Sequence, residues 1–173
     1  MATIIQPRWK RWGKEAIWLL LAGLVISSLL DYWRGPTLPA GAMSAPFTLQ
    51  DGSTTSLAAL SQGKPLLVYY WASWCGVCRF TTPVVEQLWQ DGGQVLTVAL
   101  RSGGDAQLRQ GMTRKGLSFP THNDEQGSLA AQWKIGVTPT FLIVKDGELV
   151  SSTTGWSSRW GLQLRLLWAD WSR

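Results

Sequence analysis

The sequence predicts an α/β fold, in which a central mixed β-sheet is flanked by helices and is preceded by one N-terminal transmembrane helix. An almost unbroken apolar run at 65–72 is typical of a central strand buried on both faces. A helical segment at 76–90 and a second strand at 94–100 follow it, and this alternation indicates a parallel βαβ unit. The third observation is an uncharged segment, 16–30, near the N-terminus.

That N-terminal segment has the features of a membrane anchor. Residues 1–14 are basic, with Arg8, Lys10, Arg11 and Lys14. A helix from Trp12 to Trp33 would be about 33 Å long, which matches the hydrocarbon thickness of a bilayer. We therefore expect a transmembrane signal-anchor helix at 15–33, with residues 1–14 in the cytoplasm and the rest of the chain on the other side of the membrane.

A cleaved signal peptide is the alternative, because the small-x-small triplet 40–42 resembles a cleavage site. In both cases the remainder is exported to a compartment in which disulfides persist. Residues 34–43 contain proline and glycine and predict a linker, and residues 44–173 predict one globular domain.

The composition argues against a nucleic-acid-binding protein. The chain has 173 residues, 45% of them apolar, and a formal charge of +5. Residues 35–173 hold eleven basic and nine acidic side chains, so the domain is nearly neutral. Nucleic-acid binding needs a concentrated basic face, and the basic cluster of this chain instead adjoins the apolar segment.

The remaining elements follow in order along the domain. Local patterns predict a short alternating strand from Phe47 with a turn at Asp51-Gly52, a brief helix from Ser56, a helix at 105–115, a short helix at 127–133, a hairpin at 140–154 that turns at Asp146-Gly147, and a final helix from Ser158. The stretch between 116 and 126 carries no clear pattern.

The final helix carries an apolar stripe within an arc of roughly 100°. It is formed by Trp160, Leu164, Leu167, Trp168 and Trp171. We expect this stripe to pack on the sheet. The alternative is a face for a membrane or a partner.

Cys75 and Cys78 are the only two cysteines. A bridge across so short a loop would add little stability, so a structural disulfide is the weakest interpretation. A zinc site lacks ligands, because the chain has one histidine, His122; a Cu(I) site assisted by Met43 or Met112 stays open.

Electron transfer fits the position of the pair, between a buried strand and the start of a helix. Backbone N–H groups at a helix start stabilise a thiolate, here at Cys75. Cys78, one turn later, would resolve the mixed disulfide. Further along, Pro139 directly precedes an apolar strand, where it can donate no ladder hydrogen bond.

Taken together, "YYWASWCGVC", Pro83, "VTPTFLIVKDGEL" and Gly155 resemble the thioredoxin superfamily. The length between Cys75 and Pro139 and the "FTLQDG" opening are similar to the membrane-anchored TlpA/ResA/CcmG-like branch. Within it, "WCGVCRFTTP", "RSGGD" and "IGVTPT" most resemble the suppressor-of-copper-sensitivity (ScsD) group. The resemblance covers roughly residues 44–171.

This resemblance implies a thioredoxin-like fold and a periplasmic protein-disulfide oxidoreductase, held by one span in a bacterial inner membrane. Its redox centre would be the Cys75–Cys78 disulfide, with no dissociable cofactor and no metal. Its partners would be protein thiols and disulfides and a membrane electron donor, with a role in copper or oxidative stress tolerance. The expected positioning residues are Trp74, Gly76, Val77, Thr138 and a cis-Pro139, where the Thr138 backbone would pair with a substrate strand.

Two positions depart from the family pattern. Tyr69 stands where thioredoxins have a buried aspartate, and Thr81 stands where cytochrome c maturation members have a glutamate. The group that takes the proton from Cys78 is thus left open, and we expect Glu86 and His122 to be surface residues. A periplasmic Cu(I)-binding protein and a thiol peroxidase remain the alternative functions.

Overall fold

The structure is a computed structural model, and it describes residues 15–19, 21–23, 25–26, 29 and 36–172. The chain divides into two compact units, Met1–Arg34 and Gly35–Arg173. The second unit contains all of the strands and the site described below.

The first unit contains the predicted membrane anchor, much of which lies outside the described residues. Those residues of 15–33 that the structure describes are helical. Within the described part of the chain, no helix is both long and apolar enough to cross a membrane. The predicted cytoplasmic segment 1–14 lies wholly outside the described residues.

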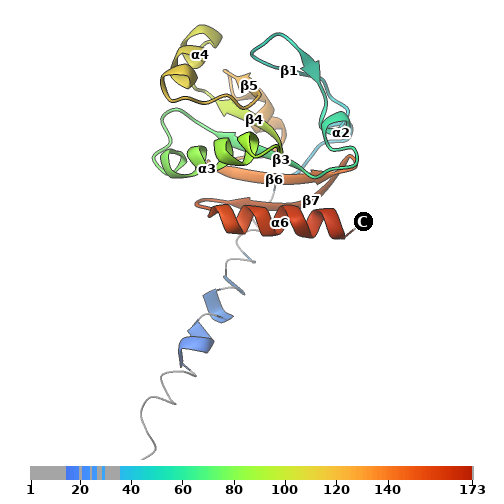
Figure 1. The fold of residues 1–173 in the computed structure, drawn as a ribbon, viewed down its shortest axis with the longest axis vertical. Coiled ribbons are helices and arrows are strands. Elements are labelled where there is room, and N and C mark those ends of the chain that lie inside the picture. Colours follow the sequence, from blue (N-terminus) through green and yellow to red (C-terminus); the bar gives the residue numbers. More distant parts are fainter. Residues whose placement is uncertain (1–14, 20, 24, 27–28, 30–35, 173) are drawn as a thin grey trace, which may run out of the picture. The chain divides into compact units, whose positions relative to one another are not determined.

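Five strands of the second unit form one mixed sheet in the order β5-β4-β3-β6-β7 (Figure 1). Strands β3, β4 and β5 are parallel, whereas β6 runs antiparallel to β3, and β7 antiparallel to β6. A separate two-stranded sheet joins β1 to β2. The strand bounds are β1 Phe47–Thr48, β2 Thr54–Thr55, β3 Leu66–Trp71, β4 Gln94–Leu100, β5 Thr121–Asp124, β6 Thr140–Lys145 and β7 Glu148–Thr154.

Alternating residues of β3 feed two apolar layers, one on each face of the sheet. Leu67, Tyr69 and Trp71 belong to the layer that also contains buried residues of α3, α4 and α6. Val68 and Tyr70 belong to the opposite layer, which is covered by β1, α2 and α5. The helix bounds are α2 Leu57–Leu60, α3 Cys78–Gln90, α4 Asp105–Arg114, α5 Ser128–Gln132 and α6 Arg159–Trp171.

Most predicted elements are confirmed within two residues of their expected ends. The helix expected at 76–90 begins at Cys78, and Pro83 lies inside its first turns. β5 was not predicted, because "THND" has no apolar alternation. It is a strand because it pairs with β4, from Thr97↔Thr121 to Leu100↔Asp124.

The described part of the predicted linker is packed on the domain. The Thr37 N–H donates to the Trp133 carbonyl at 3.1 Å. Leu38 and Met43 pack against the layer that contains β1, and Ala42 is buried there. The chain is therefore fixed to the domain from Thr37 onward.

The expectation that the stripe of α6 packs on the sheet is wrong. All five of its members are exposed, and the buried residues of α6 are Leu162 and Ala169 on the opposite side of the helix. Helix α6 contacts β6 and β7 through the side that carries Leu162 and Ala169 (Figure 1). The large side chains consequently point away from the sheet.

Candidate active site

The cysteines lie at the carboxyl end of β3, where the chain turns into α3. The turn is closed by a hydrogen bond from the Cys75 N–H to the Ala72 carbonyl, 3.2 Å. The Ser73 N–H donates to the Ser102 hydroxyl at 2.9 Å, which ties the loop to the end of β4. The cysteines are thus held by two neighbouring strands.

Cys75 and Cys78 form a disulfide, with 5.3 Å between their Cα atoms. Cys75 is 7% exposed and Cys78 is 2% exposed, so Cys75 is the sulfur that a partner can reach. This order fits an attacking Cys75 and a shielded, resolving Cys78, although these roles stay predictions.

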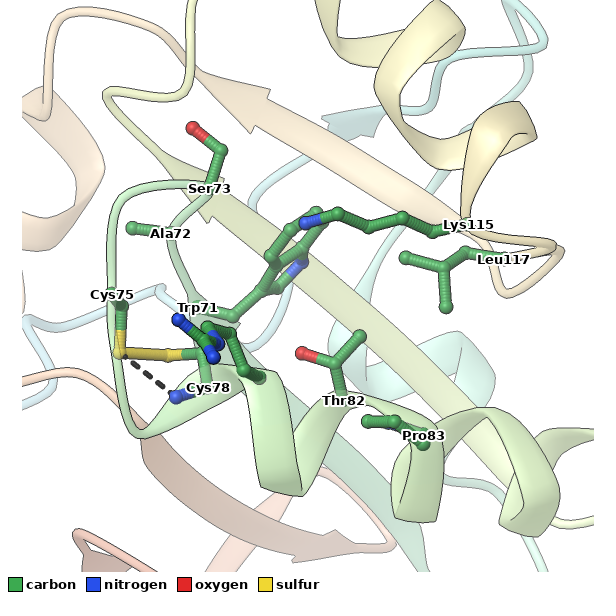
Figure 2. A pocket seen from close by; sticks show the side chains of 10 residues that line it. Trp71, Ala72, Ser73, Cys75, Cys78, Thr82, Pro83, Lys115 and Leu117 are labelled. Atoms are coloured by element: carbon green, nitrogen blue, oxygen red, sulfur yellow. Dashed lines mark hydrogen bonds between the residues drawn. A yellow bond between two sulfur atoms is a disulfide. The ribbon is translucent and has the colours of Figure 1, made fainter.

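The start of α3 directs a hydrogen-bond donor at Cys75. The Cys78 N–H donates to the Cys75 Sγ at 3.2 Å, the dashed line in Figure 2. Val77 occupies the N-cap position without a side-chain hydrogen bond, so the sulfur takes the place of a capping oxygen. When the disulfide opens, negative charge on Cys75 meets this N–H and the positive end of the helix.

The loop before β6 lies on another side of the disulfide from the start of α3. The Thr138-Pro139 bond is cis, as the resemblance implied. The Thr138 carbonyl oxygen lies 3.5 Å from the Cys75 Sγ. This loop is fixed by the Gly155 N–H, which donates to the Pro139 carbonyl at 2.8 Å, and by the Thr140 hydroxyl, which donates to the Val137 carbonyl at 2.7 Å.

Exposed apolar side chains belong to the segments that carry the disulfide and Pro139. Trp74 is 63% exposed, and its indole N–H donates to the Arg101 carbonyl at 3.1 Å, which fixes the ring. Val77, Phe80 and Val137 are also exposed. Phe80 and Val137 were not predicted as site residues, and only their nearness in sequence to Cys78 and Thr138 signals them.

A pocket of about 330 Å³ opens beside the disulfide (Figure 2). The lining includes the apolar side chains of Trp71 and Leu117 and two cationic side chains, Arg79 and Lys115. Figure 2 shows Lys115 extending from the segment after α4 toward the indole of Trp71. The full lining is Trp71, Ala72, Ser73, Cys75, Cys78, Arg79, Thr82, Pro83, Lys115 and Leu117, without a carboxylate.

The two departures from the family pattern contact one another. The Tyr69 hydroxyl lies 2.9 Å from the Thr81 and Thr82 hydroxyls. Burial raises the pKa of Tyr69, against the opposing effect of these two hydrogen bonds, so the phenol stays protonated at neutral pH. A neutral hydroxyl cluster therefore occupies the positions at which relatives carry acids.

Glu86 is buried, so the expectation of a surface residue is wrong. Its carboxylate accepts hydrogen bonds from the Ser118 N–H at 2.9 Å, the Ser118 hydroxyl, the Phe119 N–H and the Gln90 amide. Burial works to raise the pKa of Glu86, but these hydrogen bonds outweigh it and hold the pKa below 4.5. Glu86 joins α3 to the segment before β5 and does not contact either sulfur.

Of the other candidate metal ligands, Met112 belongs to the same buried cluster as the cysteines, whereas His122 and Met43 lie in the opposite layer or at its edge. The His122 ring, half-buried on β5, packs on Phe47, and its Nδ1 lies 2.9 Å from the Thr48 carbonyl. Met43 packs in the same layer, across the sheet from the disulfide. Among the residues that the structure describes, no group of three or more His, Cys, Asp and Glu side chains has the placement to hold a metal.

Comparison with known proteins agrees with this geometry. Residues 35–159 match the family model described as Redoxin. The chain belongs to the Redoxin family. A thioredoxin-like protein of Haemophilus influenzae is 42% identical over 163 residues, which cover 93% of this chain and 96% of the relative.

A second relative and a solved structure agree with this family. ResA of Oceanobacillus iheyensis, named a thiol-disulfide oxidoreductase, is 30% identical, covering 82% of this chain and 80% of its own. A secreted disulfide oxidoreductase of Mycobacterium tuberculosis, described as homologous to Escherichia coli DsbE, has the same fold with a TM-score of 0.61. It is 23% identical and covers 75% of this chain and 98% of its own.

This Redoxin chain is a thioredoxin-like thiol-disulfide oxidoreductase related to ResA, with its CxxC pair at 75–78.

Proposed function

We propose that this oxidoreductase is anchored in a bacterial inner membrane by residues 15–33 and exchanges disulfides with protein thiols in the periplasm. Cys75 exchanges with the client and Cys78 resolves the mixed disulfide. The observation that carries the proposal is the contact of 3.5 Å between the Cys75 Sγ and the Thr138 carbonyl. It brings the more exposed sulfur beside a backbone segment that continues β6 beyond its last ladder pair, Tyr70↔Thr140.

An extended client segment can add to such a free strand end through backbone hydrogen bonds. Thr138 then supplies the backbone, while Trp74, Val77 and Phe80 supply an apolar surface for the client side chains. A protein client suits this open surface better than a small molecule, because small molecules are usually bound in enclosing cavities.

The direction of electron flow in the cell depends on the donor that recharges the pair. The branch and the predicted anchor support a membrane-embedded electron donor, which keeps the cysteines reduced. The resemblance to the ScsD group supports a role in repairing thiols oxidised under copper stress.

The test is to trap clients on Cys75. The full chain with Cys78→Ser is expected to accumulate mixed disulfides with periplasmic proteins, because the resolving thiol is absent. The matched Cys75→Ser variant is expected to trap far less, since Cys78 is only 2% exposed. Equal trapping by both variants contradicts the assigned roles.

The reduction potential then separates the alternatives. Equilibration with glutathione buffers is expected to give a two-electron couple, near or below about −250 mV for a reductase. Tight stoichiometric Cu(I) binding without such a couple would favour the copper-binding alternative. Rapid oxidation of Cys75 by hydrogen peroxide, without client trapping, would favour the peroxidase.

A further inference from the structure

Helix α6 exposes a continuous apolar stripe. The exposed fractions are 76% for Trp160, 64% for Leu164, 65% for Leu167, 54% for Trp168 and 88% for Trp171. No charged residue lies within the arc formed by these five side chains. Contiguous exposed apolar surfaces of this kind mark sites of contact with proteins or membranes. We call these five residues the α6 stripe.

The orientation of the helix is fixed by contacts on its other sides. Leu162 and Ala169 are fully buried against the sheet. Asp170 accepts from the Lys145 ammonium at 3.1 Å, and Arg159 pairs with Asp91 at 2.6 Å. Leu162, Ala169 and the charged residues of α6 thus hold the helix to the domain, and the α6 stripe is left facing outward.

The composition of the stripe fits a lipid–water interface. Three of its five members are tryptophan, and Trp156, one turn before the helix, is 67% exposed as well. The indole ring combines a large apolar body with one N–H donor, which suits the headgroup level of a bilayer. An amphipathic helix with such a face lies in the plane of the interface.

The length of the chain before the domain supplies the second argument. The domain is fixed from Thr37, whose N–H is bonded to the Trp133 carbonyl. The expected anchor ends at residue 33, so only 34–36 separate the two. The chain takes four steps from residue 33 to Thr37, and each step spans at most about 3.6 Å. The expected anchor therefore holds Thr37 within about 14 Å of the membrane. A bilayer surface is therefore always within reach of the domain, whereas a partner protein has to diffuse to it.

We propose that the α6 stripe docks on the phospholipid surface of the membrane that anchors the chain. The stripe then contacts headgroups and the upper acyl chains. The proposal rests on the anchor of the proposed function. Docking fixes the orientation of the domain and hence the direction in which the disulfide faces.

The experiment uses the full chain in vesicles of phosphatidylethanolamine and phosphatidylglycerol. A bimane fluorophore is attached to Leu167→Cys in a Cys75→Ser/Cys78→Ser background, and lipids with nitroxide-labelled acyl chains quench it. The matched control carries the label at Gln110→Cys, an exposed position on α4. We expect severalfold stronger quenching at 167 than at 110.

Each other outcome overturns the proposal. Equal quenching at both positions, in a chain that sediments with the vesicles, rejects the α6 stripe as the lipid contact but keeps the anchor. Weak quenching of the labelled chain, together with a disulfide between two unlabelled Leu167→Cys chains, assigns the stripe to a second copy of the chain. A chain that stays in the supernatant rejects both anchor and docking.

Disulfide exchange provides an independent readout. A variant with Trp160, Trp168 and Trp171 changed to serine is expected to reduce a small soluble disulfide at the unaltered rate, since these side chains do not touch the site. The same three substitutions, placed in the labelled Leu167→Cys chain without Cys75 and Cys78, are expected to abolish quenching at position 167 in vesicles. Loss of exchange in both the variant and the parent chain would instead contradict the proposed function.

Discussion

Cys75 can be reached by a partner, and its sulfur is stabilised by a backbone hydrogen bond. It is the more exposed of the two sulfurs, it accepts the Cys78 N–H, and it lies beside the Thr138 carbonyl. No acid was found in contact with either sulfur among the described residues, and the neighbouring hydroxyls of Tyr69 and Thr81 are bonded to each other. Cys75 is therefore stabilised by the backbone N–H of Cys78 and the start of α3 rather than by a buried carboxylate.

Arg79 and Lys115 give the pocket a positive lining without a carboxylate. We expect clients with acidic residues beside their cysteine to react faster than matched clients with amides. Changing both residues to glutamine is expected to lower the acidic-to-neutral rate ratio about three- to tenfold, the effect of losing two exposed charge pairs. Stopped-flow reduction of paired peptides measures this ratio.

The control is Lys64→Gln, an exposed change before β3. It is expected to leave the ratio unaltered. If both rates fall equally in the double variant, the cations act on the thiol and not on the client.

The hydrogen bonds of Glu86 are expected to contribute a free energy of unfolding that is lost in acid. Because its pKa lies below 4.5 in the folded protein, the unfolded chain binds more protons as the pH falls. The contribution is complete above an unfolded pKa of about 4.5 and is lost as the pH falls through the lower, folded value. Glu86→Gln is expected to flatten the fall in unfolding free energy as the pH decreases from neutral through the folded pKa of this carboxyl.

The same substitution is expected to cost about 2 kcal/mol at neutral pH, because buried donors of Ser118 lose a charged acceptor. Urea denaturation at several pH values measures both effects, with the exposed Gln87→Ala as the control. An unchanged pH profile would show that another carboxylate carries the acid sensitivity.

Among the elements, β5 and α6 show how neighbours override local pattern. β5 is polar, yet it forms because β4 offers it a ladder and because the hydroxyls of Thr97 and Thr121 meet at 2.8 Å. The α6 stripe has strong helical periodicity but faces outward. Periodicity identifies an apolar face and does not reveal what that face contacts.

The orientation of α6 predicts opposite results for two leucines that lie two positions apart in the helix. Leu162→Ala removes a fully buried side chain and is expected to cost about 2–5 kcal/mol. Leu164→Ala removes an exposed one and is expected to stay within about 0.5 kcal/mol. Urea unfolding of the two variants in detergent tests the orientation, and a larger loss for Leu164→Ala would reverse it.

At the scale of the whole molecule, the sheet separates the redox site from a second apolar layer. Cys75 and Cys78 belong to one layer. Phe47 belongs to the other, with its ring 5.9 Å from Trp133 and 5.5 Å from His122 between centroids. Stability and reactivity can therefore be altered separately.

Phe47→Ala is expected to cost about 3–5 kcal/mol by opening a cavity in that second layer. The reduction potential of the Cys75–Cys78 pair in this variant is expected to match that of the parent chain, because the substitution does not change the layer that contains the disulfide. Chemical denaturation and glutathione equilibration give the two values. A shifted potential with unchanged stability would contradict this separation.

The sequence by itself determined the strands and helices other than the short polar strands, the hairpin at Asp146-Gly147 and the position of the cysteine pair between β3 and α3. These features depend on local periodicity, turn residues and short-range spacing, which are all visible along the chain. The cis bond before Pro139 could be predicted only from the resemblance to the family, because few bonds that precede a proline are cis.

Only the tertiary structure decided the features that depend on distant neighbours. Burial of Glu86 requires the N–H groups before β5, and the hydroxyl cluster requires Tyr69 of β3 to meet Thr81 of α3. The cations of the pocket come from α3 and from the end of α4, 36 positions apart in sequence (115 minus 79). The outward face of α6 follows from which side of the helix fits the sheet, a question of shape that local hydrophobicity does not answer.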